Sequence, residues 1–348
     1  MVNLRKQFEK ALKLIEVNGR KLDRAKDAHT EIRELLQQDK QLKEWGIEPL
    51  LTGSYGRQTG IYPGKDVDVF LRLTELDKRY EPKVVYDAVW RVIFQEYGQE
   101  GGRAEQQARS IKVSFPDDDG TSGTHGDFSV DAVPAVRDGK LWAIPTKDQD
   151  HWVRGEGRWV TTGAVRFGDL STELNQAANC PMVGDRHAYK PTVKLVRQIR
   201  ETHLGDKRPG GLYLEFVTFD AWRSGLINGT EWDVLLAQTL KYIANRLNRA
   251  SEEPLLDPVL RTPVDPPLSE YEVGHAAAIF SQLAASANRA LGMDIGGATT
   301  LWRKILGGNE LAESVFPNSQ EAGGNGGVKI TAAGVAASTR RNDAPRFG

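Results

Sequence analysis

The sequence predicts an α+β fold in which a strand-rich part is followed by a helical part. Residues 1–45 carry apolar side chains at helical spacing, residues 46–184 contain runs that alternate between apolar and polar residues, and residues 185–317 return to helical spacing. Spacings of three and four residues place side chains on one face of a helix, whereas alternation places them on one face of a strand. We therefore expect N-terminal helices that pack on the body, a mixed or antiparallel sheet with flanking helices, and a second domain of helices.

Two helical segments are predicted within residues 1–45. An Asn-Gly pair favours a turn, so Asn18-Gly19 is expected to break or kink this region. The apolar faces before and after the break are formed by Leu4, Phe8, Leu12 and Ile15, and by Ala25, His29, Ile32 and Leu36.

A Gly-Ser turn followed by two aspartates in an apolar strand is the most informative pattern in the chain. Asp66 and Asp68 are two positions apart, so their carboxylates leave a strand on the same side, while Val67, Val69 and Leu71 fill the other side. Two like charges side by side repel each other unless a cation lies between them, and Mg²⁺ prefers oxygen ligands of this kind. The pattern predicts a magnesium site on this strand, with Mn²⁺ as the alternative ion.

The Gly-Ser turn is expected to hold the phosphates of a nucleotide. Gly53 permits a tight turn after a strand, and Ser54 can cap a short helix whose free N–H groups point at an anion. Arg57 and Lys65 are close enough in sequence to add positive charge. An ordinary loop before an exposed acidic strand is the alternative, but the turn and the Asp-x-Asp pair together favour a triphosphate site.

A third carboxylate is expected on a neighbouring strand. Alternating residues on both sides of a turn-rich segment predict a hairpin over residues 110–134. Asp131 is the preferred ligand because apolar residues bracket it, and Asp127, which follows a Gly-rich turn, is its competitor. Pro134 cannot donate a ladder hydrogen bond, so Asp131 is expected near the end of its strand.

Further helices are predicted in both parts of the chain. A helix around residues 84–97 should face the sheet through Val85, Val89, Val92, Ile93 and Tyr97. Prolines between residues 251 and 272 predict an extended connection between helices. The helices expected beyond residue 185 cover residues 187–204, 211–227, 231–250, 273–292 and 298–307.

Composition excludes several classes of protein. The net charge of −1 gives no general attraction to nucleic acid or membrane, and a single cysteine, Cys180, excludes internal disulfides and cysteine-based zinc sites. Without an apolar run of membrane-spanning length or a signal-peptide pattern, we expect a cytoplasmic protein with no membrane partner. Residues 318–348 are rich in Gly, Ala and Ser and are expected to form a flexible tail.

These motifs resemble those of the DNA-polymerase-β-like nucleotidyltransferase superfamily. Within it, the chain resembles the CD-NTases, which are bacterial cyclic-oligonucleotide synthases of antiphage (CBASS) signalling related to cGAS and the oligoadenylate synthetases. The resemblance covers most of residues 45–317. It rests on Gly53-Ser54, Asp66-Val67-Asp68, the segment 130–134, the helical stretch 190–200, Gly210-Gly211-Leu212-Tyr213-Leu214-Glu215, and Val315-Phe316-Pro317.

The resemblance implies a polymerase-β-like catalytic core and two-metal nucleotidyl transfer. One Mg²⁺ on Asp66 and Asp68 would grip the triphosphate, and a second, shared with Asp131, would lower the pKa of a ribose hydroxyl and aim it at the α-phosphorus. Successive transfers from NTPs, ATP among them, would close a cyclic di- or trinucleotide second messenger. A downstream effector is expected to bind this product rather than the chain itself.

The second domain is implied to complete the nucleotide site. Members of the resembled family often place a lysine on a second-domain helix to hold the donor triphosphate. Here Arg197 takes that place, with Lys194 one turn earlier on the same face, and either residue can fill the role. This chain has Gly211 where relatives often have a serine that contacts the triphosphate. Tyr213 either packs on a nucleobase or fills the helical core.

Two other functions stay open for this chain. A nucleotidyltransferase that modifies an RNA end, a protein or a small molecule is the first, although the neutral charge balance argues against a long RNA-binding surface. A non-catalytic nucleotide-binding protein is the second, which an incomplete triad of aspartates would indicate.

Some members of the resembled family have tails that a ubiquitin-transfer-like enzyme joins to other molecules. Gly348 is therefore a candidate conjugation point, and a disordered end without function is the alternative.

Overall fold

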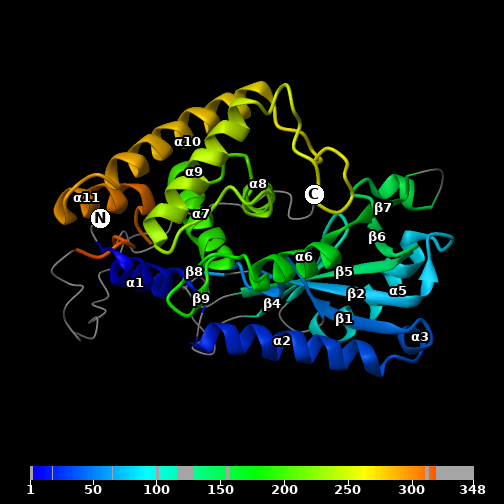
Figure 1. Ribbon diagram of the computed structural model, residues 1–348. Coiled ribbons are helices and arrows are strands. Elements are labelled where there is room, and N and C mark those ends of the chain that lie inside the picture. The colour runs from blue at the N-terminus through cyan, green and yellow to red at the C-terminus, as the bar shows by residue number, and fades with distance from the viewer. Residues whose placement is uncertain are drawn as a thin grey trace. The chain divides into compact units, whose positions relative to one another are not determined.

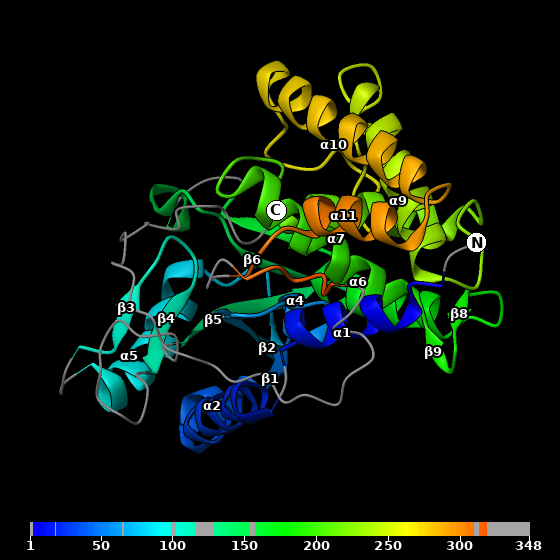
Figure 2. The ribbon, with the colours of Figure 1, turned by 90° about the vertical axis from the view of Figure 1, so that its left-hand side faces the viewer.

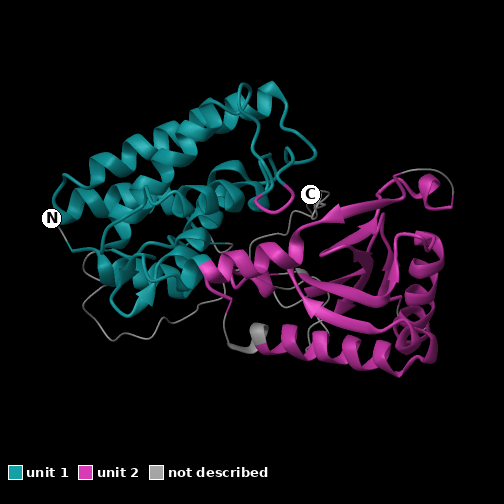
Figure 3. Ribbon diagram, turned by 45° about the vertical axis from the view of Figure 1, so that its right-hand side comes forward, with its two compact units in different colours: residues 1–15, 174–257, 261–348 teal, residues 16–173, 258–260 magenta. Residues whose placement is uncertain are grey.

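The chain forms two compact units, a sheet unit and a helical unit (Figure 3). The computed structural model describes residues 3–17, 19–64, 66–98, 102–115, 128–153, 157–309 and 313–318, without the side chains of residues 19–22 and Asp66. The sheet unit consists of the described residues of 16–173 and 258–260, and the helical unit of those of 1–15, 174–257 and 261–348.

This division differs from the domain boundaries expected at residues 45 and 184. The first fifteen residues belong to the helical unit. There the ring of Phe8 packs edge-on against Trp302 and Phe316, with centroid distances of 5.1 and 4.9 Å. The following helix, α2 (Gly19–Gln38), belongs to the sheet unit, so the two N-terminal helices pack on different units. The predicted tail from residue 319 onward lies outside the described residues.

The sheet unit is built around a seven-stranded mixed sheet (Figure 1). Its strand order is β1-β2-β5-β4-β3, and β6 joins the far end of β5 and pairs in turn with β7. Only β2 and β5 are parallel; every other described pair in this sheet is antiparallel. The strands are β1 (Ile47–Leu51), β2 (Asp66–Asp77), β3 (Ala104–Gln106), β4 (Ile111–Phe115), β5 (Phe128–Asp138), β6 (Leu141–Pro145) and β7 (Trp159–Thr162).

Helices cover both faces of this sheet. Figure 1 shows α2 along one face and α6 over the other, and in Figure 2 α5 lies beside β3 and β4. On the α2 face, alternate residues of β2 such as Val67, Val69 and Leu71 are fully buried and form one core with α2 and α5. The remaining helices of this part are α3 (Lys40–Glu44), α4 (Gly53–Gly56), α5 (Pro82–Tyr97), α6 (Ala164–Gln176) and the 3₁₀ helix η1 (Gln149–Trp152).

Helical periodicity in the sequence predicted α2 and α5. All five residues expected to face the sheet from α5 are buried. The break at Asn18-Gly19 is confirmed, since α1 (Arg5–Ile15) ends before it and α2 begins at Gly19. The sequence interpretation missed α6, where only Phe167 and Ser171 are buried.

The expected end of the strand after Asp131 is wrong. β5 continues through Pro134 to Asp138, and Pro134 pairs with Leu71 of β2. On its other edge, β5 pairs with β4 as far as Ala132 and with β6 only from Val136. No described strand partner lies at residues 133–135 on that edge, so a residue without an N–H is tolerated there.

The helical unit contains the predicted helices with small changes at their ends. Val315 and Phe316, part of the terminal motif on which the resemblance rests, are buried in its core. Its elements are α1, β8 (Met182–Val183), β9 (Arg186–His187), α7 (Tyr189–Leu204), α8 (Gly211–Arg223), α9 (Trp232–Asn248), α10 (Glu270–Ala290) and α11 (Ile295–Leu306). None of the helices that the structure describes is both long and apolar enough to cross a membrane.

Candidate active site

Two of the predicted aspartates face each other across the parallel strand pair. Asp68 of β2 and Asp131 of β5 are direct register partners. Neighbouring strands lie about 4.8 Å apart, and residues opposite each other project from the same face. Asp131 is 2% exposed and Asp68 is half-buried. The hairpin that brings Asp131 to this position is confirmed, because β4 pairs with β5 from Phe115–Phe128 to Ile111–Ala132.

Asp66 begins β2 two residues before Asp68. Its register partner is Ser129, two residues before Asp131. The backbone therefore places the Asp66 position one step along the same pair of strands. The side chain of Asp66, the whole of Lys65 and the competing Asp127 lie outside the described residues, so their predicted roles stay predictions.

The Gly-Ser turn packs directly against the Asp68 carboxylate. Gly53 has a φ of +60°, and a Cβ at this position would lie 1.7 Å from Oδ2 and 2.6 Å from Cγ of Asp68. The backbone N–H of Thr52 donates to the Asp68 carbonyl oxygen at 2.9 Å, which extends the pairing of β1 with β2 up to the turn. Glycine at residue 53 is therefore required twice, for the backbone conformation and for the space that the carboxylate occupies.

Ser54 lies inside the short helix α4 rather than at its cap. The N-cap is Thr52, whose side chain makes no capping hydrogen bond, so the expected capping role of Ser54 is wrong. The Ser54 carbonyl oxygen accepts hydrogen bonds from the backbone N–H groups of Thr59 at 2.9 Å and Gly60 at 3.1 Å. These bonds close the loop after α4, with the partly exposed Ser54 side chain next to Gly53.

Arg57 follows α4 and is buried beside this turn. Its side chain is 6% exposed, and the guanidinium carbon lies 5.3 Å from the centroid of the Phe167 ring of α6. Its backbone N–H donates to the Gly53 carbonyl oxygen at 3.2 Å. The predicted contribution of Arg57 to a triphosphate site stays a prediction.

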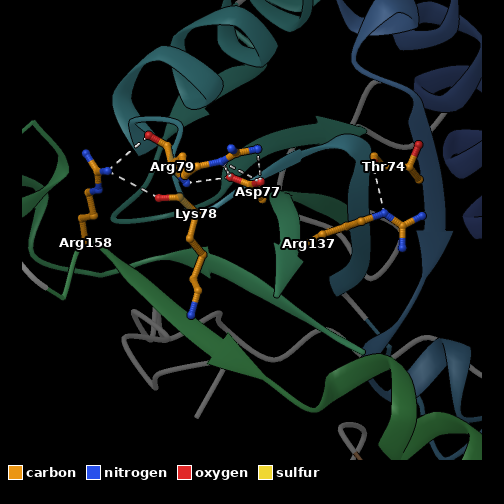
Figure 4. A network of polar contacts seen from close by, with 6 residues as sticks. All are labelled: Thr74, Asp77, Lys78, Arg79, Arg137 and Arg158. Carbon is orange, nitrogen blue, oxygen red and sulfur yellow. Dashed lines mark hydrogen bonds and ion pairs between the residues drawn. The ribbon is translucent and has the colours of Figure 1, made fainter. Parts of the chain in front are cut away.

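The strands that carry the aspartates are also tied together beyond the site (Figure 4). β2 and β5 change register near their carboxyl ends. In this region Nε of Arg137 donates to the carbonyl oxygen of Thr74 at 2.7 Å. Arg158 donates to the carbonyl oxygens of Lys78 at 3.4 Å and Arg79 at 3.2 Å. The Arg137 bond joins β5 to β2 where their ladder is irregular, and the Arg158 bonds join the segment before β7 to the turn after β2.

The described carboxylates fit a hard divalent cation. Asp68 and Asp131 are adjacent, at least half-buried, and followed on the same face by the fully buried Phe70 and Val133. Like charges in such a setting repel each other, and a cation bound between them removes this repulsion. Among the side chains that the structure describes there is no group of three or more potential metal ligands. The Asp66 side chain, which would complete the set, is not among them.

The predicted second-domain residues lie in the helical unit. Lys194 and Arg197 are both half-buried on α7. Nη1 of Arg197 forms an ion pair with Oε2 of Glu215 on α8 at 3.2 Å. Tyr213, in the first turn of α8, is half-buried, and burial raises its pKa although Arg246 and Arg208 oppose this.

Two further residues that support these elements were not found from the sequence. Tyr55 donates its hydroxyl hydrogen bond to the Gly64 carbonyl oxygen at 2.7 Å, which holds the loop between α4 and β2 closed. Nothing in the local pattern indicates this bond. Glu215 could have been found, because a single charge inside the apolar helix Leu212–Val217 indicates a buried carboxylate with a partner.

Comparison with known proteins relates this geometry to a family. Residues 2–164 match the model of the Second Messenger Oligonucleotide or Dinucleotide Synthetase (SMODS) domain. A curated relative, the Cyclic AMP-AMP-AMP synthase of an Acinetobacter species, is 25% identical over 225 residues, which cover 62% of this chain and 57% of the relative. The chain thus matches a little over half the length of this curated relative.

Two solved structures share the fold over nearly their whole length. Escherichia coli MS115-1 CdnC with ATP has a TM-score of 0.67 and 14% identity, and the match covers 91% of this chain and 99% of CdnC. The Bradyrhizobium diazoefficiens CD-NTase CdnG in complex with GTP has a TM-score of 0.63 and 15% identity, and the match covers 87% of this chain and 97% of CdnG. The predicted α+β architecture with a helical second part is therefore confirmed. The part of the chain that carries the aspartates is thus similar to the SMODS domain, and the chain shares the fold of the CdnC and CdnG structures.

Proposed function

We propose that the protein is a metal-dependent synthase that joins NTPs into a cyclic di- or trinucleotide second messenger for antiphage signalling. The observation that carries this proposal is the direct pairing of Asp68 with Asp131 beside a glycine turn that fits around the Asp68 carboxylate. Paired carboxylates next to a glycine turn that opens a short helix suit the transfer of a nucleotide from a triphosphate.

Asp66, Asp68 and Asp131 would hold two Mg²⁺ ions, or Mn²⁺ in their place. Bound divalent cations supply positive charge to the triphosphate and lower the pKa of the attacking hydroxyl. Asp131 accepts the proton of the ribose hydroxyl at a carboxylate oxygen. Gly53 and Ser54 position the phosphates beside Asp68, and the buried Phe70 and Val133 exclude water behind the carboxylates. The rate then depends on alignment and charge rather than on a covalent intermediate.

ATP is the first NTP to test as substrate. The curated relative is a Cyclic AMP-AMP-AMP synthase, and the CdnC structure contains ATP. The product, rather than this chain, would bind a downstream effector. Conjugation of Gly348 by a ubiquitin-transfer-like enzyme stays a prediction from the resemblance, because residues 319–348 lie outside the described part of the chain.

Labelled NTPs, singly and in mixtures, should be incubated with the purified protein and Mg²⁺, and the products identified by mass spectrometry. A cyclic oligonucleotide formed without any added acceptor supports the proposal. Label that appears only on an added RNA, protein or small molecule would show the alternative transferase. Binding of NTP without any product would show a non-catalytic nucleotide-binding protein.

Ser54→Ala and Lys194→Ala should each weaken NTP binding about ten- to a hundredfold. A lost hydrogen bond to a charged group is worth roughly 1.5–3 kcal/mol, which corresponds to this change in affinity. Isothermal titration with a non-hydrolysable ATP analogue measures the effect. Lys241→Ala, which removes an exposed lysine of α9, is the matched control and should bind as tightly as the wild type. Unchanged affinity in the Lys194 variant would exclude this residue from the triphosphate site.

A further inference from the structure

Lys112 is a cation on the face of the sheet that carries the aspartates. Its neighbours on β4, Ile111 and Val113, are fully buried in the core that β2 forms with α2 and α5. Side chains alternate along a strand, so Lys112 projects from the opposite face. Its register partner on β5 is Asp131, and Asp131 in turn pairs with Asp68 of β2. These three side chains therefore form one row across three neighbouring strands.

The ammonium of Lys112 is open to a ligand. The Lys112 side chain is half-buried, and within the described part of the chain its ammonium forms no hydrogen bond or ion pair, although Asp131 is the neighbouring position in the row. On the other edge of β4 the register partner of Lys112 is the exposed Glu105 of β3. Glu105 is therefore also not paired with Lys112. Partial burial of a cation costs free energy unless an anion pairs with it, so this position favours an anionic ligand.

The strand order places Lys112 at the end of the row that is remote from the Gly-Ser turn (Figure 2). β1 and β5 lie on opposite edges of β2, and β4 follows β5. The turn follows β1 and packs against the Asp68 carboxylate through Gly53. From the β1 side to the β4 side, the order is the turn, Asp68, Asp131 and Lys112.

Nucleotidyl transfer brings two nucleotides together from opposite sides of the reacting phosphorus. The attacking hydroxyl and the departing pyrophosphate lie roughly in line, so the acceptor approaches from the side opposite to the leaving group. With the donor phosphates at the turn and the attacking ribose hydroxyl at Asp131, the acceptor extends toward β4. The 5′-phosphates of the acceptor are carried by the same ribose as the attacking hydroxyl. They are therefore the anion expected nearest to Lys112.

We propose that Lys112 binds the 5′-phosphates of the acceptor nucleotide and thereby selects phosphorylated nucleotides as acceptors. This inference rests on the proposed function and assigns the acceptor side of the same site. A synthase that starts without a primer has to recognise a free nucleotide as its first acceptor. An ammonium on a flexible four-carbon stem binds phosphate as a point charge, so it can follow phosphates that change position between successive transfers.

Transfer from a donor that cannot act as an acceptor tests this role. Dideoxy-ATP labelled at its α-phosphate has no ribose hydroxyl to offer, whereas AMP and adenosine can accept but cannot donate, and they differ only in the 5′-phosphate. If another NTP proves to be the substrate, its dideoxy form, monophosphate and nucleoside take these places. The wild type should use AMP with a kcat/KM about ten- to a hundredfold higher than adenosine, because AMP offers a charged partner to Lys112.

Lys112→Met removes the charge and keeps an unbranched side chain. In this variant kcat/KM for AMP should fall about ten- to a hundredfold, whereas kcat/KM for adenosine and KM for dideoxy-ATP should stay within about threefold of the wild type. Lys112→Arg keeps the charge and should recover part of the preference for AMP. The melting temperature of each variant should be measured beside the kinetics, so that rates are compared for folded protein.

Lys140→Met is the matched control, since it removes an exposed lysine from the turn after the other end of β5. It should keep the wild-type preference for AMP. An equal loss with AMP and adenosine in Lys112→Met would show a role in the chemistry or the fold and overturn the inference. A raised KM for dideoxy-ATP would place Lys112 at the donor and overturn it as well, as would a wild type without a preference for AMP.

The proposed function is checked separately in the same experiment. A cyclic product formed by the wild type from NTPs alone leaves that function standing, whatever Lys112→Met does. If the wild type forms no such product, the proposed function itself fails.

Discussion

Replacing Asp131 by asparagine is expected to lower product formation by about a hundred- to a thousandfold while leaving the fold intact. Asparagine keeps the size of the side chain but removes the negative charge that a metal ion and a proton both require. Because Asp131 lies directly opposite Asp68, removing its charge also relieves a repulsion in the metal-free protein. The melting temperature should therefore hold or rise, and it should be measured beside the rate of product formation.

Asp127→Asn is the control for this experiment. It makes the same chemical change at the other aspartate that the sequence offered as the third ligand. This variant should keep most of its activity. If Asp127→Asn is inactive and Asp131→Asn is not, the pairing of Asp68 with Asp131 is not the catalytic arrangement. Asp68→Ala and Asp66→Ala should both abolish activity without loss of the fold, and normal turnover in either variant would contradict the triad.

Local sequence patterns predicted those parts of the fold that depend only on residues close together in the sequence. The alternation of Val67, Val69 and Leu71 with Asp68 fixed which side of β2 carries the carboxylate, since a strand has only two faces. The helical spacing in α5 predicted its buried face for the same reason. Gly53 was expected at a tight turn, and its φ of +60° confirms this.

Features that depend on distant segments could not be predicted in this way. No local pattern shows that β2 pairs in parallel with β5 rather than with another strand, because this pairing joins residues about sixty positions apart. The local sequence around Pro134 predicts a strand end. The actual effect of Pro134 depends on which edge of β5 lacks a partner, and the local sequence does not show this. α6 has only two buried residues, so its apolar stripe is too narrow to distinguish a helix from a loop.

Replacing Gly53 by alanine is expected to lower turnover about a hundred- to a thousandfold, as severely as the loss of an aspartate. An alanine Cβ would occupy the position of the Asp68 carboxylate, at 1.7 Å from Oδ2 and 2.9 Å from Cβ of Asp68. The carboxylate must then turn aside, and the metal ligand and the phosphate turn lose their mutual alignment. A methyl group on the turn would thus act on the chemistry through Asp68.

Backbone strain alone must be separated from this contact. A residue other than glycine at positive φ costs roughly 1–2 kcal/mol of stability wherever it stands. Gly139, in the turn between β5 and β6, has a φ of +61° and no atom within 4 Å of a Cβ placed on it. Gly139→Ala therefore introduces the same strain without the collision.

The two alanine variants should lose similar amounts of stability in thermal unfolding but differ sharply in activity. Below its melting temperature, Gly139→Ala should form product at nearly the wild-type rate, whereas Gly53→Ala should be almost inactive. An equal loss of activity in both variants would show that strain, not the Asp68 contact, disables the enzyme. Full activity of folded Gly53→Ala would mean that the Asp68 carboxylate can move away from the turn without harm. The Asp68 carboxylate would then need no fixed position beside residue 53 for catalysis.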